Sequence, residues 1–247
     1  VEAGVRNFDE SMPEEVNRYL TDRLSDLNFC VTKLAEENLK REGFQEKKVN
    51  SKTIVTGDVM LDIFKHQIAE LESNSISFLP FDIKKNNYAL ATIHRASNVD
   101  DKYSLQNIIE SFNEIHKTIL PVLFLVHPRT QNQIKNYDLS LDCFYTTALG
   151  YNETLIALNN SKYVITDSGG LVREAYFASK KSLLLLDDPL WPEINNELCS
   201  INVGPNFEEI MNAFIGLEKL QSDFSKNIFG TGDASKIIVE KLSKFLK

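Results

Sequence analysis

Residues 163–175, YVITDSGGLVREA, predict a strand, a turn and the beginning of a helix, because a short apolar run meets a helical pattern at two adjacent glycines. Residues 168–170 would lie at the N-terminus of that helix. Backbone N–H groups there lack intrahelical partners and the helix dipole is positive, so the turn suits a phosphate. Glu174 follows about one turn later and is expected to face the same end. An ordinary turn in which Asp167 or Ser168 caps the helix explains the same residues equally well.

Around this stretch, short apolar runs alternate regularly with helical patterns. The runs are YALATI (88–93), PVLFLV (121–126), CFYTT (143–147), YVITD (163–167) and SLLLLD (182–187). Five such runs separated by helices predict an α/β fold with a doubly wound parallel sheet that is covered on both faces. Further patterns indicate a strand at 202–204 and helices at 207–217 and 234–246.

The first part of the chain also alternates between helix and strand patterns. Ser11 and Glu14 have the spacing of a capping box, which predicts a helix that continues to about Leu27. The next expected elements are a strand at 28–31, a helix at 33–41, a strand at 53–56 and an amphipathic segment at 60–71. The polar, turn-rich stretch 73–87 is the expected linker. We therefore expect residues 1–75 to be the end of a first Rossmann-like domain, and 76–247 to be a second one that includes the C-terminal helix.

Composition limits the classes of partner. The net charge is −8 over 247 residues, without a Lys/Arg block, which argues against nucleic acid or an anionic membrane as the main partner. Cys30, Cys143 and Cys199 are widely spaced in apolar surroundings, which favours buried thiols in a reducing cytoplasm over disulfides or metal ligands. The chain opens on VEAG (1–4) without Met, which reads as the end of a strand, so we expect a fragment of a longer protein.

Polar side chains follow several of the predicted parallel strands. His94 and Arg95 come after the run at 88–93, His127 and Arg129 after the run at 121–126, and Ser168 after the run at 163–167. Ligands bind along the carboxyl edge of a doubly wound sheet. A single histidine there is more often structural than catalytic. Two histidine-containing loops, two arginines and a glycine-rich helix start on one edge together favour an anionic ligand.

An ordered set of motifs covers nearly the whole chain. The set is VEAGVR (1–6), MPEEVNRYLTD (12–22), VTGDVMLD (55–62), TIHRASNVDD (92–101), VHPR (126–129), LGY (149–151), TDSGGLVREA (166–175), WPE (191–193) and GTGDAS (230–235). In this order it resembles the non-hydrolysing UDP-N-acetylglucosamine 2-epimerases. The resemblance implies a glycosyltransferase-B-like architecture, a nucleotide-sugar substrate in cell-surface polysaccharide biosynthesis, a cytoplasmic location and a homodimer at full length. It implies neither a metal nor a redox cofactor.

The resemblance also implies roles for individual residues. It places Glu2, Glu14 and His94 in catalysis, and it assigns substrate binding to Arg95, Ser168, Gly169, Gly170 and Glu174. Each acidic residue has a plainer explanation. Glu14 completes the capping box, Glu2 could be an exposed loop acid, and Glu174 could be a helix acid of the first turn. Isolated from the rest of the protein, these 247 residues are expected to hold nucleotide weakly and not to epimerise UDP-N-acetylglucosamine.

The sequence departs from the family pattern beside the proposed nucleotide site. The differences are Thr154, Val172, Arg173 and the segment Pro189, Leu190, Trp191. Because of these differences, the sequence does not determine which residues contact the nucleotide or which sugar the substrate carries. Two other functions remain alternatives, a glycosyltransferase of the same architecture and a non-catalytic module that binds nucleotide sugars.

Overall fold

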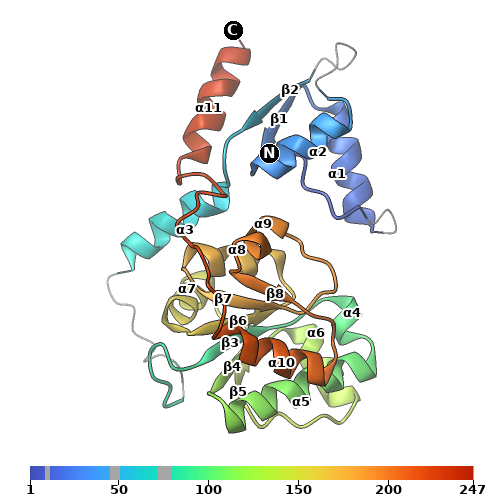
Figure 1. The fold of residues 1–247 in the computed structure, drawn as a ribbon, viewed down its shortest axis with the longest axis vertical. Coiled ribbons are helices and arrows are strands. Elements are labelled where there is room, and N and C mark those ends of the chain that lie inside the picture. The colour runs from blue at the N-terminus through green and yellow to red at the C-terminus, as the bar shows by residue number, and fades with distance from the viewer. Residues whose placement is uncertain (9–11, 45–50, 72–78, 80, 247) are drawn as a thin grey trace. The chain divides into compact units, whose positions relative to one another are not determined.

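The structure is a computed structural model, and it describes residues 1–8, 12–44, 51–71, 79 and 81–246. The chain divides into two compact units (Figure 1). The first consists of Val1–Ala69 and Ser225–Lys247, and the second of Glu70–Phe224. The expected linker at 73–87 lies partly outside the described residues.

The second unit contains the doubly wound sheet. Its six strands are β3 (Ala89–Thr92), β4 (Val122–Val126), β5 (Phe144–Thr147), β6 (Tyr163–Thr166), β7 (Lys181–Leu184) and β8 (Ser200–Asn202). They pair in the order β5-β4-β3-β6-β7-β8, and every pair is parallel. The five predicted strands and the predicted parallel sheet are therefore confirmed, and the pattern near 202 is the sixth strand.

The strand order places helices on both faces of this sheet. The helices are α4 (Ala96–Val99), α5 (Lys102–Thr118), α6 (Pro128–Asn136), α7 (Tyr151–Asn160), α8 (Gly169–Phe177), α9 (Pro192–Asn196) and α10 (Phe207–Leu217). From β3 the chain winds outward to β5, returns to β6, and then winds in the opposite direction to β8. Right-handed crossovers in opposite directions put their helices on opposite faces. The winding reverses between β3 and β6, so the topological switch point lies there.

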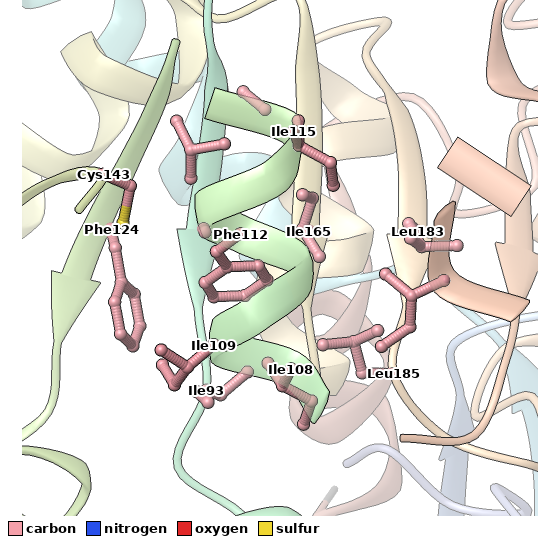
Figure 2. Close-up of a cluster of buried hydrophobic side chains, with 14 of the residues drawn as sticks. Ile93, Ile108, Ile109, Phe112, Ile115, Phe124, Cys143, Ile165, Leu183 and Leu185 are labelled. Atoms are coloured by element: carbon pink, nitrogen blue, oxygen red, sulfur yellow. The ribbon is translucent and has the colours of Figure 1, made fainter. Parts of the chain in front are cut away.

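One face of the sheet packs on α5 and α10. Alternate strand residues point to this face, as the period of two requires. Ile93, Phe124, Ile165 and Leu183 lie there in one hydrophobic cluster with Phe112, and all five side chains are fully buried (Figure 2). The ring centroids of Phe112 and Phe124 are 5.2 Å apart in an edge-on arrangement, which adds specific geometry to the burial. This core fixes the strands whose ends carry the candidate site.

The first unit combines the N-terminal and C-terminal segments. Its elements are α1 (Pro13–Leu24), β1 (Leu27–Cys30), α2 (Lys33–Arg41), β2 (Lys52–Val55), α3 (Val59–Glu70) and α11 (Ala234–Phe245). β1 and β2 pair in parallel, and Ala3 forms a bridge with Cys30. α1 ends three residues before Leu27, the end that the pattern predicted, because Leu27 already pairs with Lys52 in the sheet.

The C-terminal helix groups with the first unit, which differs from the division expected from the sequence. Asp62 of α3 supplies the physical reason, since its carboxylate accepts hydrogen bonds from the backbone N–H groups of Ala234 (3.0 Å) and Ser235 (2.7 Å). The carbonyl oxygen of Phe229 also accepts a bond from Asp58 N–H at 2.9 Å. A capped helix start and a backbone bridge thus tie α11 to α3 across more than 160 positions of sequence.

Two further observations concern the chain as a whole. Cys30, Cys143 and Cys199 are free and buried, as expected. Among the described residues, no helix combines the length and the apolar character needed to cross a membrane.

Candidate functional site

The candidate site in the second unit is built on the ends of β3 and β6. These strands are direct neighbours, and the hydroxyl oxygens of Thr92 and Thr166 lie 2.8 Å apart at their last paired position. His94 follows β3 and Ser168 follows β6. The structure therefore brings these two predicted site residues to the switch point of the sheet, where doubly wound folds bind ligands.

Ser168 is the N-cap of α8. Its hydroxyl oxygen accepts a hydrogen bond from Leu171 N–H at 3.3 Å, so of the two N-cap candidates Ser168 is the one confirmed. Gly169 and Gly170 are the first two residues of the helix. Their N–H groups belong to the set that has no carbonyl partner within a helix, and they lie at its positive end. Capping by Ser168 and anion binding by this turn are thus compatible.

Trp191 and Arg173 pack beside the same helix start. The indole Nε1–H of Trp191 donates to the carbonyl oxygen of Gly169 at 3.0 Å, and Arg173 Nε–H donates to the same oxygen at 3.3 Å. The Arg173 guanidinium lies over the Trp191 ring, 4.5 Å from its centroid. Two positions that depart from the family pattern therefore contact each other. Together they fix the backbone of Gly169.

His94 is held by Asp167. The imidazole Nδ1 lies 3.2 Å from Asp167 Oδ1, and the backbone N–H of His94 donates to the same carboxylate at 3.0 Å. The His94 side chain is 45% exposed, whereas that of Asp167 is fully buried. The hydrogen bond to Asp167 raises the pKa of His94 above its ordinary value, against the opposing effects of burial and Arg95. The arrangement favours a protonated imidazole at the site.

Arg95 connects the β3 loop to the β6 turn. Its backbone N–H donates to Asp167 Oδ2 at 2.9 Å, and its Nε–H donates to the Asp167 carbonyl oxygen at 2.8 Å. The structure thus places Arg95 at the predicted site and gives its guanidinium a partner within the protein. A role in positioning the two loops accounts for these contacts.

Glu174 faces the start of α7. It is a buried residue of α8 that hydrogen-bonds to Tyr151, the first residue of α7. Burial of the tyrosine, together with the charge and hydrogen bond of Glu174, raises the pKa of Tyr151. Glu174 and Tyr151 therefore link two helix starts at the same edge of the sheet. That Glu174 faces the N-terminus of its own helix stays a prediction.

His127 and Arg129 have structural partners at the end of β4. His127 Nδ1 accepts a hydrogen bond from the backbone N–H of Arg129 at 3.2 Å and so caps α6. Arg129 forms an ion pair with Asp100. The ring centroids of His127 and His94 are 5.9 Å apart, so both histidines lie at the same edge.

The first unit carries the other two predicted catalytic residues. Glu2 is exposed, and its φ of 65° lies in the left-handed region, which is uncommon for a residue with a side chain. The next residue, Ala3, donates its N–H to Phe29 O at 3.0 Å. Gly4 follows with a φ of 77°, and a Cβ atom there would lie 2.1 Å from the carbonyl oxygen of Ala35. The close approach of α2 therefore requires glycine at this position.

Buried polar groups fix the backbone beside Glu2. Gly4 N–H donates to Asp22 Oδ2 at 2.9 Å, and Gly4 O accepts from Asn38 Nδ2 at 3.0 Å. Arg6 pairs with Asp22 at 2.8 Å and with Glu42 at 2.8 Å. The segment that carries Glu2 is thus held from α1 and α2 by hydrogen bonds and ion pairs.

Glu14 lies in the first turn of α1 and is exposed. The capping-box explanation finds no support, because Ser11 lies outside the described residues and Met12 occupies the N-cap position. The neighbouring Glu15 is buried instead, and its carboxylate accepts from the backbone N–H groups of Asn7 (3.2 Å) and Phe8 (3.1 Å). The two adjacent glutamates therefore have separate tasks. Glu14 is directed to solvent, and Glu15 holds the loop before the helix.

Sequence reasoning missed three residues of these arrangements, Asp167 as a partner of His94, Asn98 as a partner of Asp167, and Glu15. Asn98 Nδ2–H donates to Asp167 Oδ2 at 3.2 Å. The only signals were the DSGG motif and the glutamate doublet, and neither reveals which distant backbone groups a carboxylate contacts.

Among the residues that the structure describes, no cluster of three or more His, Cys, Asp or Glu side chains could hold a metal ion.

Comparison with known proteins identifies the family of this chain. Residues 1–243 match the family described as UDP-N-acetylglucosamine 2-epimerase. The UDP-2,3-diacetamido-2,3-dideoxy-D-glucuronate 2-epimerase of Pseudomonas aeruginosa is 38% identical over 245 residues, which cover 99% of this chain and 67% of that protein. The chain belongs to the UDP-N-acetylglucosamine 2-epimerase family.

Solved structures of epimerases share its fold. The UDP-GlcNAc 2-epimerase of Methanocaldococcus jannaschii, crystallised in complex with UDP-GlcNAc and UDP, aligns with a TM-score of 0.86 at 36% identity, covering 99% of this chain and 68% of that one. The enzyme of Neisseria meningitidis, bound to UDP-GlcNAc, aligns with a TM-score of 0.86 at 28% identity, covering 99% and 69%. This member of the epimerase family thus spans about two thirds of the length of its relatives.

Proposed function

We propose that this protein interconverts UDP-N-acetylglucosamine and UDP-N-acetylmannosamine by eliminating UDP and adding it back with C2 inverted. The observation that carries the proposal is that the His94 imidazole, held by Asp167, and the N-terminus of α8 both lie at the switch point of the sheet. Both features supply positive charge where a diphosphate would lie. Membership of the epimerase family selects this reaction among those that use a nucleotide sugar.

The chemistry explains why the leaving group matters most. The C2 proton of the sugar has no adjacent carbonyl group and is not acidic. Cleavage of the bond between C1 and the diphosphate oxygen sends the electron pair to UDP and builds oxocarbenium character, which acidifies C2. A base then removes the C2 proton, and the C1–C2 double bond of a 2-acetamidoglucal forms. Stabilising the departing diphosphate is therefore the largest demand on the protein.

Two groups of the second unit meet that demand. The N–H groups at the start of α8 donate to the phosphate oxygens, and the dipole of a helix adds about half a positive charge. His94, whose pKa is raised by Asp167, donates a proton or a hydrogen bond to the same oxygens. Neither group has to reorganise as charge develops on UDP, because each is fixed by the sheet.

Glu2 and Glu14 are the proposed groups for proton transfer at C2. Both carboxylates are exposed, and the segment of Glu2 is held rigidly by Asp22 and Asn38. Inversion at C2 requires removal of the proton from one face and its return to the other. Two carboxylates can divide these tasks.

The name of one relative supports a second candidate for the sugar of the substrate. The Pseudomonas aeruginosa relative, at 38% identity, is named for a diacetamido glucuronate carried on UDP. Elimination and re-addition of UDP require only the nucleotide and the C2 proton, so the same residues would act on either sugar. Competition between the two UDP-sugars for turnover distinguishes them, and the preferred one has the higher kcat/KM.

The function is tested with protein expressed from the whole reading frame that encodes these residues. It is incubated with UDP-N-acetylglucosamine, and the anomeric proton signals of both epimers are followed by NMR. We expect an equilibrium mixture of the two. Glu2→Gln and Glu14→Gln should each bind UDP normally and slow interconversion by orders of magnitude. Transfer of the sugar to an acceptor would support a glycosyltransferase instead, and tight binding without turnover would support a binding module.

We also propose a cytoplasmic location and a homodimer, both of which the family resemblance implies. The buried free thiols of Cys30, Cys143 and Cys199 support the location, because such thiols persist in a reducing compartment. Cell fractionation tests the first proposal. Light scattering tests the second, and a monomeric mass over the working range of concentration would refute it.

A further inference from the structure

Asp167 is a buried carboxylate in the turn between β6 and α8, and its side-chain contacts all lead away from that turn. Ser168 caps α8, so the Asp167 side chain is not the N-cap. Its oxygens instead accept from the backbone N–H groups of His94 (3.0 Å) and Arg95 (2.9 Å) and from the side-chain amide of Asn98 (3.2 Å). All of these donors come from the loop that follows β3 and the short helix α4.

A buried carboxylate is costly unless its charge is compensated. Three amide donors compensate part of the charge of Asp167, and His94 Nδ1 at 3.2 Å is the remaining partner. The side chain of His94 is 45% exposed, whereas that of Asp167 is fully buried. The histidine thus lies between a fixed negative charge and the ligand edge.

We propose that Asp167 is a positioning residue for His94, which fixes the imidazole with Nδ1–H toward the carboxylate and so leaves Nε2 to serve the departing diphosphate. Asn98 donates to the other carboxylate oxygen, Oδ2, and its amide also donates to the carbonyl oxygen of Leu185 at 2.9 Å, so it supports the carboxylate in this orientation. This inference rests on the proposed function, because it assigns the leaving group of that reaction to His94.

The charges around His94 agree with this assignment. The groups that face it are Asp167 from the β6 turn, Arg95 from its own loop and His127 from the end of β4. His127 Nδ1 accepts a hydrogen bond from Arg129 N–H, so that nitrogen faces the backbone of α6. Asp167 raises the pKa of His94, and Arg95 lowers it. The carboxylate is therefore the group among these that favours the charged form of the imidazole.

Histidine NMR tests the pairing without any assay of activity. The chain has four histidines, so the ring signals are assigned with four single His→Gln variants. In the unchanged protein we expect His94 to titrate above its ordinary pKa and to carry its proton on Nδ1 when neutral. Asp167→Asn should move the titration to lower pH. Unchanged titration in Asp167→Asn, or a neutral His94 protonated on Nε2, would overturn the proposal.

A matched variant distinguishes the effect of the Asp167 charge on the His94 titration from the effect of any negative charge near this loop. Asp100 is an exposed aspartate at the end of α4 that pairs with Arg129. Asp100→Asn removes the same charge near the same loop and should leave the His94 titration in place. Asn98→Ala removes the supporting amide and keeps the carboxylate. It should therefore change the His94 ring signals, by broadening or by a shift, to a smaller extent than Asp167→Asn does.

Kinetics then tests the consequence for the reaction. Asp167→Asn should lower kcat about 100-fold, the cost of a misplaced catalytic group, and should move the alkaline fall of kcat/KM to lower pH. A purely structural role would lower stability and leave the pH profile in place. If the protein proves not to epimerise, the proposed function fails, and the NMR titration together with the pH dependence of UDP binding still decides the role of Asp167.

Discussion

Arg6 offers the sharpest prediction about the first unit, and the perturbation is Arg6→Met. Its guanidinium side chain is only 2% exposed and pairs with Asp22 and Glu42, whose side chains are 7% and 18% exposed. Methionine keeps much of the length and removes the charge. The buried carboxylate of Asp22 and the half-buried carboxylate of Glu42 would then lack their cation. Of the partners described above, Asp22 would keep only the N–H of Gly4.

The expected magnitude follows from the burial. Removing one partner of a buried ion pair costs about 3–5 kcal/mol. Folded domains are stable by only about 5–15 kcal/mol, so the variant should lose a large part of the stability of the first unit. Arg18→Met is the matched control, because Arg18 is 37% exposed and lies 3.4 Å from Glu15. A partly exposed pair of this kind contributes about 1 kcal/mol or less.

Hydrogen exchange of peptides from each unit is the appropriate assay. A chain with two compact units need not unfold in one step, so a single melting midpoint would mix their responses. We expect faster exchange in peptides from residues 1–8 and 27–44 of Arg6→Met, and unchanged exchange in β3, β4 and β6. Equal effects of Arg6→Met and Arg18→Met in these peptides would refute the reasoning.

Three other predictions concern Gly4 of the first unit and Gly170 and Asp167 of the second. Gly4→Ala should destabilise the first unit by more than about 2 kcal/mol, because φ is 77° and the new Cβ would meet the carbonyl oxygen of Ala35 at 2.1 Å; an exchange pattern like that of the unchanged protein would contradict it. Gly170→Val should weaken UDP binding at least about tenfold in calorimetry by blocking the start of α8, and unchanged affinity in a folded variant would refute the site. The raised pKa of His94 and the lowered pKa of Asp167 mean that their attraction stabilises the second unit below the folded pKa of the histidine and above that of the aspartate. Asp167→Asn should therefore cost more stability at about pH 6 than at about pH 9, as measured by denaturant titration, and equal costs would contradict this sign.

Local patterns predicted much of the fold. The apolar runs before His94 and Ser168 became β3 and β6, and the periodic stretches 33–41 and 207–217 are helices with those limits. These elements are decided by neighbours within a few residues, which a sequence displays directly. The short helices α4 and α9 were not predicted, because four or five residues carry too little periodicity.

Contacts between distant segments account for what the sequence concealed. The grouping of α11 with the first unit depends on Asp62, and the charge on His94 depends on Asp167, 73 positions away. Asp167 resembled a helix cap in the sequence, and only the parallel pairing of β3 with β6 shows that it faces His94. The roles of Glu14 and Glu15 differ for the same reason, since the second glutamate is the one that the backbone of residues 7 and 8 contacts.

Deuterium exchange at C2 is the measurement that tests the central claim most directly. Protein from the whole reading frame is incubated with UDP-N-acetylglucosamine in deuterated water, and the C2 position of the recovered nucleotide sugars is examined by NMR. We predict deuterium at C2 in both epimers, with the rate reduced by orders of magnitude in His94→Ala while that variant stays folded. Folded protein that binds UDP and leaves the C2 proton in place, or His94→Ala that exchanges at the original rate, would contradict the account.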